Sequence, residues 1–122
     1  IENFKNKEEK WIKYLIQFEL NYLEFMGFGI DLSECALTGS NDSLEWVSPK
    51  SGRAVSSIAG KKWSKKLLKI PPFLLNIKHD VSISDLIDGL NLTGYFLSKQ
   101  IYSELNRELP SSRKKIIDSL NS

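Results

Sequence analysis

The sequence contains very little cysteine, histidine or methionine, with one residue of each among its 122 residues. A single cysteine excludes a disulfide within the chain and is typical of a reducing compartment. No apolar run approaches the roughly 20 residues that a membrane-spanning helix requires, and the first residues lack the pattern of a secretory signal peptide. We therefore expect a cytoplasmic protein without a membrane segment.

The scarcity of cysteine also bears on residues 35–59, which have the layout of a zinc module with two knuckles. The four ligand positions of such a module would be Cys35, Thr38, Ser56 and Ala59. Two Cys-x-x-Cys pairs separated by roughly 15–20 residues mark a tetrahedral zinc site, but only one thiolate remains here. One soft ligand cannot hold zinc, so we predict no metal and no other cofactor. Packing and hydrogen bonds must then hold this segment together.

Acidic residues are missing from the middle of the chain. No Asp or Glu occurs between Glu45 and Asp80, whereas the remainder carries nine basic and fifteen acidic residues. Such charge segregation carries information about binding partners rather than about the fold. It favours a partner that presents phosphate groups or an acidic peptide. The acid-free stretch contains eight basic residues: Lys50, Arg53, Lys61, Lys62, Lys65, Lys66, Lys69 and Lys78.

Length and composition indicate one domain. Apolar residues make up 41% of the chain and charged residues 26%, which is ordinary for a globular protein. A chain of this size buries about two-thirds of its unfolded surface, so it needs neither disulfides nor metal to fold. Because the sequence opens on Ile1 rather than methionine and soon enters a helix, we expect it to be part of a longer protein.

The clearest helix spans Lys7 to Met26. Asn6 and Glu9 have the spacing of a capping box at its start, and Gly27 or Gly29 would end it. Its apolar residues recur at three- and four-residue intervals over a wide face, so we expect a central, largely buried helix. The inward stripe is predicted to contain Trp11, Leu15, Phe18, Tyr22 and Phe25, widened by Ile12, Ile16, Leu20 and Leu23.

The middle of the chain predicts a small β-hairpin followed by a short helix. Leu44–Val47 and Arg53–Val55 are β-leaning pieces around a turn rich in proline, serine and glycine. Ser57–Leu68 is the short helix, although Gly60 weakens it and Pro71 and the proline after it stop it. Its inward residues are predicted to be Ile58, Trp63, Leu67 and Leu68, with the lysines outward.

A second long helix begins after Ser82 or Ser84, with Asp85 and Asp88 in its first turns. Gly89 and Gly94 would either allow close helix packing or mark a break. Its inward stripe is predicted to contain Leu86, Leu90, Thr93, Leu97, Ile101 and Leu105. A last short helix starts near Pro110, and its basic side carries Arg113, Lys114 and Lys115. The fold class is therefore mainly α: a helical bundle of two long and two or three short helices with a small β-hairpin insertion.

Several runs, in this order and at this spacing, resemble the C-terminal domain of the bacterial recombination mediator RecO. They are Phe18–Leu20, Gly27–Gly39, Val47–Ser56, Leu90–Leu97 and Leu109–Arg113. The resemblance covers nearly the whole chain. It implies that residues 1–122 form one mostly helical domain with a zinc-finger-like remnant within 35–59. It also implies that an N-terminal oligonucleotide-binding barrel, absent here, precedes the domain. Some members carry four zinc-binding cysteines at the positions that Cys35, Thr38, Ser56 and Ala59 occupy here.

The resemblance also implies a role in RecFOR-type DNA repair and recombination. RecO-like proteins bind single- and double-stranded DNA, anneal complementary strands and help to load the recombinase RecA. They bind the partner RecR and the acidic C-terminal tail of the single-strand binding protein. This chain is then expected to be a non-enzymatic mediator module, associated with the bacterial nucleoid during repair.

The acid-free stretch is the candidate nucleic-acid site. Lysine acts as a flexible point charge and suits contact with the phosphate backbone without base reading. An aromatic side chain among the lysines could stack on unpaired bases. The alternative is a solvated lysine face with the tryptophan buried in the core. The residues predicted to contact nucleic acid are Lys50, Arg53, Lys61, Lys62, Trp63, Lys65, Lys66 and Lys69.

The acidic tail of the single-strand binding protein requires an apolar pocket for its terminal aromatic side chain and cations for its carboxylates. The resemblance places such a pocket in the helical domain, and the candidates for its lining are Lys10, Lys13, Tyr14 and Phe18. The alternative makes Tyr14 and Phe18 ordinary core residues. The position just before Phe18, often basic in the family, is here occupied by Gln17.

Two further function classes compete with a mediator module. A scaffold or dimerisation domain would use the basic face only for solubility. A hydrolase would need His79, the sole histidine, which stands beside Asp80. No nucleophile elbow, phosphate loop or His-Glu-x-x-His pattern accompanies it. We interpret His79 as a surface-loop residue and expect no enzymatic activity.

Overall fold

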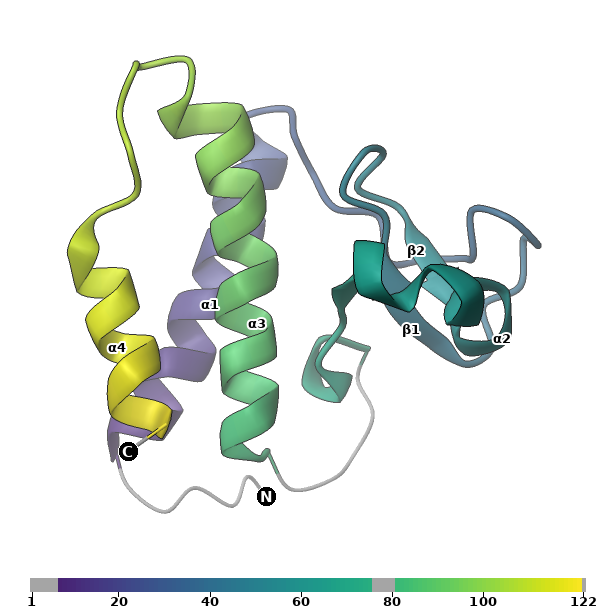
Figure 1. Cartoon of the computed structure of the whole chain (residues 1–122), viewed down its shortest axis with the longest axis horizontal. Helices are drawn as coiled ribbons and strands as arrows, with labels where there is room; N and C mark the ends of the chain where they lie inside the picture. The colour runs from purple at the N-terminus through teal and green to yellow at the C-terminus, as the bar shows by residue number, and fades with distance from the viewer. Residues whose placement is uncertain (1–6, 76–80, 122) are drawn as a thin grey trace.

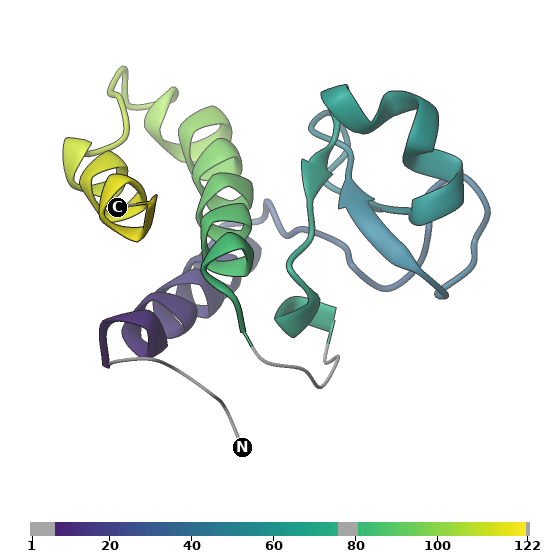
Figure 2. The same ribbon diagram turned by 60° about the horizontal axis from the view of Figure 1, so that its bottom comes forward.

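The computed structural model describes residues 7–75 and 81–121, except for the side chains of residues 7 and 8. Two lobes lie side by side in it: one is helical, and the other contains the strands and the short helices (Figures 1 and 2). Asn6, Lys78, His79 and Asp80 lie outside the described residues, so their predicted roles remain predictions. The mainly α fold with a small β insertion is confirmed.

The helical lobe is built from α1 (Lys7–Phe25), α3 (Ile83–Leu97) and α4 (Ser111–Asn121). α3 contacts both other helices and continues into a π-helical turn, η3 (Ser98–Tyr102). It also contacts β3 of the second lobe, so it forms the centre of the molecule (Figure 2). The two long helices and the last short helix are therefore confirmed.

Local sequence explains where the helices begin and end. Ser82 caps α3: its hydroxyl accepts a hydrogen bond from the Asp85 backbone, and the Asp85 carboxylate accepts one from the Ser82 backbone. At the end of α1, Gly27 has a φ of 90°. The backbone bonds from Gly27 to Glu24 and from Phe28 to Leu23 complete a Schellman motif there.

The second lobe contains β1 (Leu44–Val47), β2 (Ala54–Ser56) and β3 (Leu68–Lys69) in an antiparallel sheet of order β2-β1-β3. The predicted hairpin is confirmed as β1 and β2, whereas β3 was not predicted. The predicted short helix divides into α2 (Ser57–Gly60) and the 3₁₀-helix η1 (Lys61–Lys66), and η2 at residues 72–75 follows β3.

Two buried clusters hold the elements together. One lies between the sheet and the α1–α3 pair, and it contains Leu23, Val47, Ala54, Ile70, Leu92, Phe96 and Leu97. The other lies between the first half of α1, α3 and η2, and it contains Ile12, Ile16, Phe73, Leu86 and Leu90. Both clusters include residues of α1 and α3, so this helix pair contributes to the buried core of both lobes.

The predicted inward stripe of α1 is partly wrong. Trp11, Phe18, Tyr22 and Phe25 are exposed, Phe25 to 86%, while the aliphatic residues of the same helix are buried or half-buried. The reason is the close approach of α1 to α3 at Gly89. A β-carbon at Gly89 would lie 2.7 Å from Ile16 Cδ1, so the interface has no room for rings. Of the alternatives for Gly89, close packing is the one that the structure shows. Leu105, predicted to face inward, is exposed as well.

A candidate nucleic-acid interface

The turn between β1 and β2 places Lys50 at an exposed tip. The backbone of Gly52 donates to the Ser48 carbonyl at 2.8 Å and that of Ser48 to the Arg53 carbonyl at 3.0 Å, which closes the turn. Gly52 has a φ of 71°, a conformation that glycine adopts without strain. The Ser48 and Ser51 hydroxyls accept bonds from the Lys50 and Arg53 backbones.

The 3₁₀-helix η1 carries the other lysines. Its start is fixed by Gly60, because a β-carbon there would lie 2.5 Å from Trp46 Cδ1 of β1. After Gly60 the chain tightens from α- to 3₁₀-helical, with three residues per turn. The lysines of η1 are all exposed, and they are Lys61, Lys62, Lys65 and Lys66.

The tighter helix also corrects two predicted orientations. Trp63 and Ile58 were expected to face inward, but their side chains are 54% and 88% exposed. The prediction assumed one continuous α-helix, whereas the winding changes after Gly60, so residues on either side of Gly60 do not share the predicted face. Leu67 and Leu68 are half-buried.

Two of the predicted basic residues are matched by carboxylates. Arg53 Nη2 lies 3.9 Å from Glu34 Oε1, and Lys69 Nζ lies 3.8 Å from Glu45 Oε2. The Lys69 ammonium also lies 5.0 Å from the centre of the Trp46 ring. Both carboxylates come from outside the acid-free stretch, so folding neutralises part of the charge that the sequence segregates.

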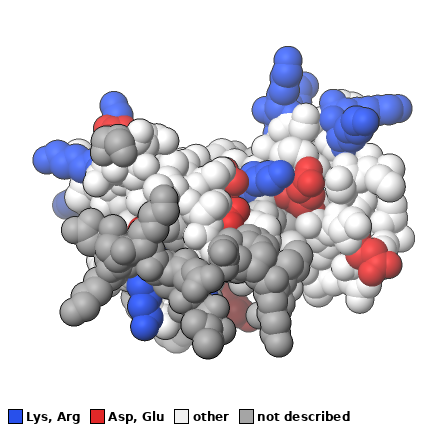
Figure 3. All heavy atoms as spheres, turned by 90° about the horizontal axis from the view of Figure 1, so that it is seen from below, with Lys and Arg blue, Asp and Glu red and all other residues white. Residues whose placement is uncertain are grey.

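The remaining five predicted lysines form what we call the lysine cluster: Lys50, Lys61, Lys62, Lys65 and Lys66. Within residues 7–75 and 81–121, no carboxylate forms an ion pair with any of them. Figure 3 shows Lys and Arg side chains projecting from the sheet lobe, away from the nearest acidic groups on that face. The arrangement provides a positive surface on which anions can bind.

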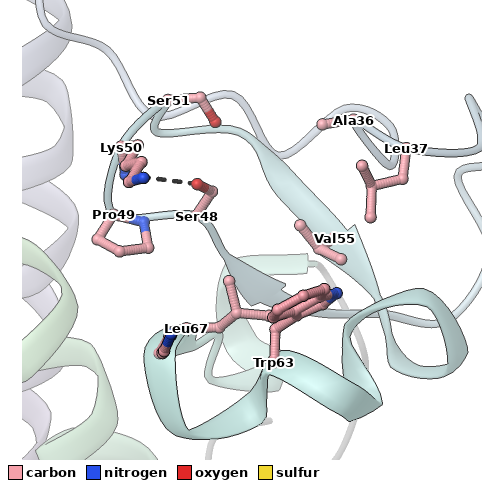
Figure 4. A pocket seen from close by; sticks show the side chains of 10 residues that line it. Ala36, Leu37, Ser48, Pro49, Lys50, Ser51, Val55, Trp63 and Leu67 are labelled. Atoms are coloured by element: carbon pink, nitrogen blue, oxygen red, sulfur yellow. Dashed lines mark hydrogen bonds between the residues drawn. The ribbon is translucent and has the colours of Figure 1, made fainter.

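A cavity of about 470 Å³ lies beside this cluster, between the hairpin turn and η1. In Figure 4 the Trp63 ring lies opposite the Ala36–Leu37 loop and Val55, with Leu67 next to it. Two members of the lysine cluster, Lys50 and Lys66, contribute to its lining. The complete lining is Ala36, Leu37, Ser48, Pro49, Lys50, Ser51, Val55, Trp63, Lys66 and Leu67.

Most of this lining was not predicted from the sequence. The cavity draws on three segments, around Leu37, Ser51 and Trp63, that meet only after the hairpin has formed. None of them has a local pattern that indicates a cavity. The one available signal was an aromatic residue among lysines, which pointed to Trp63.

Cys35 lies at the centre of the zinc-finger-like remnant and is buried. The Ser56 backbone donates to its sulfur at 3.3 Å, and the Ala59 backbone donates to the Ser56 hydroxyl at 3.3 Å. Burial raises the pKa of the Cys35 thiol. Hydrogen bonds from the Thr38 hydroxyl and from the backbones of Ser56, Leu37 and Thr38 outweigh it and lower the pKa to about 6. No cation lies next to Cys35 in the sequence, and the lowered pKa, which the Thr38 hydroxyl and backbone donors produce, was not predicted.

The remnant does not fit zinc. Ser56 and Cys35 are engaged with backbone N–H groups, and Ala59 offers no ligand atom. Nowhere in the described part of the chain do three or more His, Cys, Asp or Glu side chains gather as metal ligands would. Hydrogen bonds connect the two knuckles instead.

The predicted peptide-binding residues lie on α1. Tyr14 and Phe18 are exposed to 50% and 64%, so the alternative that made them core residues is wrong. Lys10 is exposed beside them, while the Lys13 ammonium lies 5.9 Å from the centre of the Phe73 ring. The Phe18 and Tyr22 rings stack at 6.5 Å. Together with Trp11 and Phe25, these aromatic residues form an exposed stripe, which we call the α1 aromatic stripe.

No helix among the described residues is long and apolar enough to span a membrane.

The sequence matches a family model described as recombination protein O C terminal over residues 1–108. A DNA repair protein RecO from Phenylobacterium zucineum (strain HLK1) is 46% identical over 111 residues, which cover 91% of this chain and 46% of that protein. One from Bartonella quintana (strain Toulouse) is 44% identical over 117 residues, covering 95% of this chain and 46% of that protein. No solved structure matches the chain. The chain thus spans about half the length of these curated relatives, and it belongs to the RecO family, matching the family's C-terminal region.

Proposed function

We propose that this domain is a non-enzymatic mediator module of DNA repair and recombination that binds the DNA backbone. The lysine cluster, with no carboxylate partner among the described residues, is the observation that carries the proposal. The curated relatives of this chain are named DNA repair proteins, and these names agree with such a role. The expected partners are single- and double-stranded DNA, the tail of the single-strand binding protein, and RecR.

The chemistry of lysine suits backbone contact. An ammonium group is a compact point charge on a flexible stem, so it follows phosphates without reading bases. Each phosphate that a lysine neutralises releases counterions, and the affinity then falls linearly with salt on a logarithmic scale. The cluster is therefore expected to support binding without sequence specificity.

A salt titration of single-stranded DNA binding tests this proposal. Replacing Lys61, Lys62, Lys65 and Lys66 with glutamate should weaken binding and flatten the log–log slope. Lys114 and Lys115 on α4 are exposed lysines of the other lobe, and their replacement with glutamate is the matched control. An unchanged slope in the η1 variant would remove the DNA assignment.

We further propose that α1 receives the acidic tail of the single-strand binding protein. Lys10, Tyr14 and Phe18 follow one another at intervals of four residues, which places them on one face of α1. An exposed ring next to an exposed ammonium suits a peptide that ends in an aromatic residue and carboxylates. Tethering of the domain to single-strand binding protein on the DNA, together with strand annealing, would assist the loading of RecA.

Calorimetric titration of the tail peptide, with and without its last aromatic residue, tests the α1 site. Phe18→Ala should weaken binding of the complete peptide and leave the truncated peptide at its already low affinity. Phe25→Ala, at the far end of the same helix, is the control. Equal binding of both peptides would contradict the assignment.

The alternative function is a scaffold or dimerisation domain without nucleic-acid contact, and the α1 aromatic stripe favours it. Contiguous exposed apolar surface is typical of protein–protein contact. A pure scaffold would bind neither DNA nor the tail peptide. Sedimentation at increasing protein concentration, compared with the same measurement on Phe18→Ala, separates self-association from the mediator function.

A further inference from the structure

We propose that the cavity beside η1 holds one unpaired base of single-stranded DNA, stacked on Trp63, while the neighbouring phosphates contact the lysine cluster. This inference rests on the proposed DNA binding and adds a ligand class to it. It changes the expected preference of the domain. A surface of lysines alone contains nothing that selects single strands over duplexes, whereas a base pocket selects strands whose bases are free.

The cavity has the size and lining for a base. Its volume of about 470 Å³ lies within the range of small-ligand sites, roughly 300–1,000 Å³. Trp63 provides a ring that is more than half exposed, on the side opposite Val55 and the Ala36–Leu37 loop (Figure 4). Every base has an aromatic face, so stacking on a tryptophan tolerates all sequences.

The polar groups at the turn suit any base as well. The hydroxyl oxygens of Ser48 and Ser51 accept bonds from the backbones of Lys50 and Arg53. Each hydroxyl keeps its own hydrogen, which can rotate to donate to an oxygen or nitrogen of the bound base. The turn therefore offers hydrogen bonds without a fixed donor–acceptor code.

The charges lie where the phosphates of an inserted nucleotide would be. Lys50 and Lys66 line the cavity from the hairpin turn and from η1, two elements on its border. Lys61, Lys62 and Lys65 extend the positive surface along η1 beyond the cavity. A backbone that enters and leaves the pocket thus meets ammonium groups before and after the base.

An acidic peptide with a terminal aromatic residue is the competing occupant, and the chemistry of the lining favours the nucleotide. Planar arginine groups are suited to bidentate recognition of carboxylates, but the cavity lining contains lysine and no arginine. Arg53, the arginine of the neighbouring turn, pairs with Glu34. The positive surface also continues beyond the cavity, whereas a terminal carboxylate needs cations at one point.

A binding comparison between oligothymidylate and an abasic oligonucleotide of the same length isolates the pocket. Both carry the same phosphates, and only the first has bases to insert. Fluorescence anisotropy with the full chain should show the oligothymidylate binding about tenfold more tightly, the usual size of one stacked base. Trp63→Ala should abolish this difference without changing the affinity for the abasic strand, and Trp63→Phe should retain most of it.

Trp11→Ala is the matched control, because Trp11 is exposed to a similar extent, 56%, but lies in the helical lobe. Failure of both oligonucleotides to bind would overturn the proposed DNA function and the pocket with it. Equal binding of both strands, unaffected by Trp63→Ala, would leave DNA binding intact and refute the pocket. Displacement of the strand by an acidic tail peptide, lost in Trp63→Ala, would assign the cavity to the peptide and also refute the base.

Discussion

The guanidinium group of Arg113 donates a hydrogen bond to the carboxylate of Glu19 and so joins α4 to α1. The pair is largely buried, with side chains 12% and 9% exposed. Further hydrogen bonds join the pair to α3. Arg113 Nη2 donates to the Leu90 carbonyl at 2.9 Å, and the fully buried Thr93 hydroxyl donates to Glu19 Oε1 at 2.7 Å. One polar network therefore fixes all three helices of the lobe.

Arg113→Ala is expected to destabilise the domain by about 3–5 kcal/mol, because it leaves the Glu19 carboxylate buried without its counterion. Urea unfolding followed by circular dichroism measures this change. The neighbouring substitution Lys114→Ala should stay within about 0.5 kcal/mol of the parent protein, since surface positions contribute little.

Replacing both partners together, by Glu19→Leu and Arg113→Met, is expected to cost less than Arg113→Ala alone. The double variant leaves no unpaired charge in the helix interface. Unfolding of Arg113→Ala at the same urea concentration as the parent would show that the network does not hold α4.

The helices could be predicted from the sequence, but the face of α1 that is buried could not. Apolar residues surround most of that helix, so their periodicity does not say which of them meets α3. Ile16 is one residue that does, and the reason lies on α3, where Gly89 leaves room for a methyl group but not for a ring. The buried face of α1 is therefore determined by the contact between Ile16 and Gly89, two positions that lie far apart in the sequence.

The candidate site was predictable in kind but not in detail. Local composition indicated a basic surface with an aromatic residue, and Trp63 lies beside the lysine cluster. The charge partners could not be read from the sequence, because Glu34 and Glu45 reach Arg53 and Lys69 only in the folded sheet lobe, Glu45 through the pairing of β1 with β3. The segregation of charges along the sequence overestimates the unpaired positive charge of the folded protein wherever folding brings carboxylates next to the basic residues.

A second prediction concerns Cys35 and pH. Its pKa is lowered from 9.0 to about 6 in the folded protein, so the folded state binds fewer protons than the unfolded state between these values. Stability from this group is thus present above the unfolded pKa and is lost as the pH falls through the folded pKa. The free energy of unfolding should fall with decreasing pH in this window, relative to Cys35→Ser.

Thiolate absorbance in the ultraviolet measures the same group directly. Its midpoint should lie near pH 6 in the folded protein, and Thr38→Val should raise it by removing a hydroxyl donor. Cys35→Ser, which lacks the thiol, supplies the baseline. A midpoint at the ordinary value of an exposed thiol would show that the hydrogen bonds do not stabilise the anion.

The last prediction compares the DNA contribution of a lysine in the lysine cluster with that of a lysine paired with a carboxylate. Lys65 and Lys69 are both exposed and lie four residues apart, but within residues 7–75 and 81–121 only Lys69 has a carboxylate, Glu45, as an ion-pair partner. Lys65→Ala should therefore weaken single-stranded DNA binding and lower the magnitude of the salt slope by about 0.7, whereas Lys69→Ala should change both much less. Glu45→Gln should remove one of the two carboxylates that act on the Lys69 ammonium, the other being Asp88, and should raise the affinity. Equal losses in Lys65→Ala and Lys69→Ala would mean that pairing with Glu45 does not withdraw Lys69 from the DNA. The positive surface would then extend beyond the lysine cluster to β3.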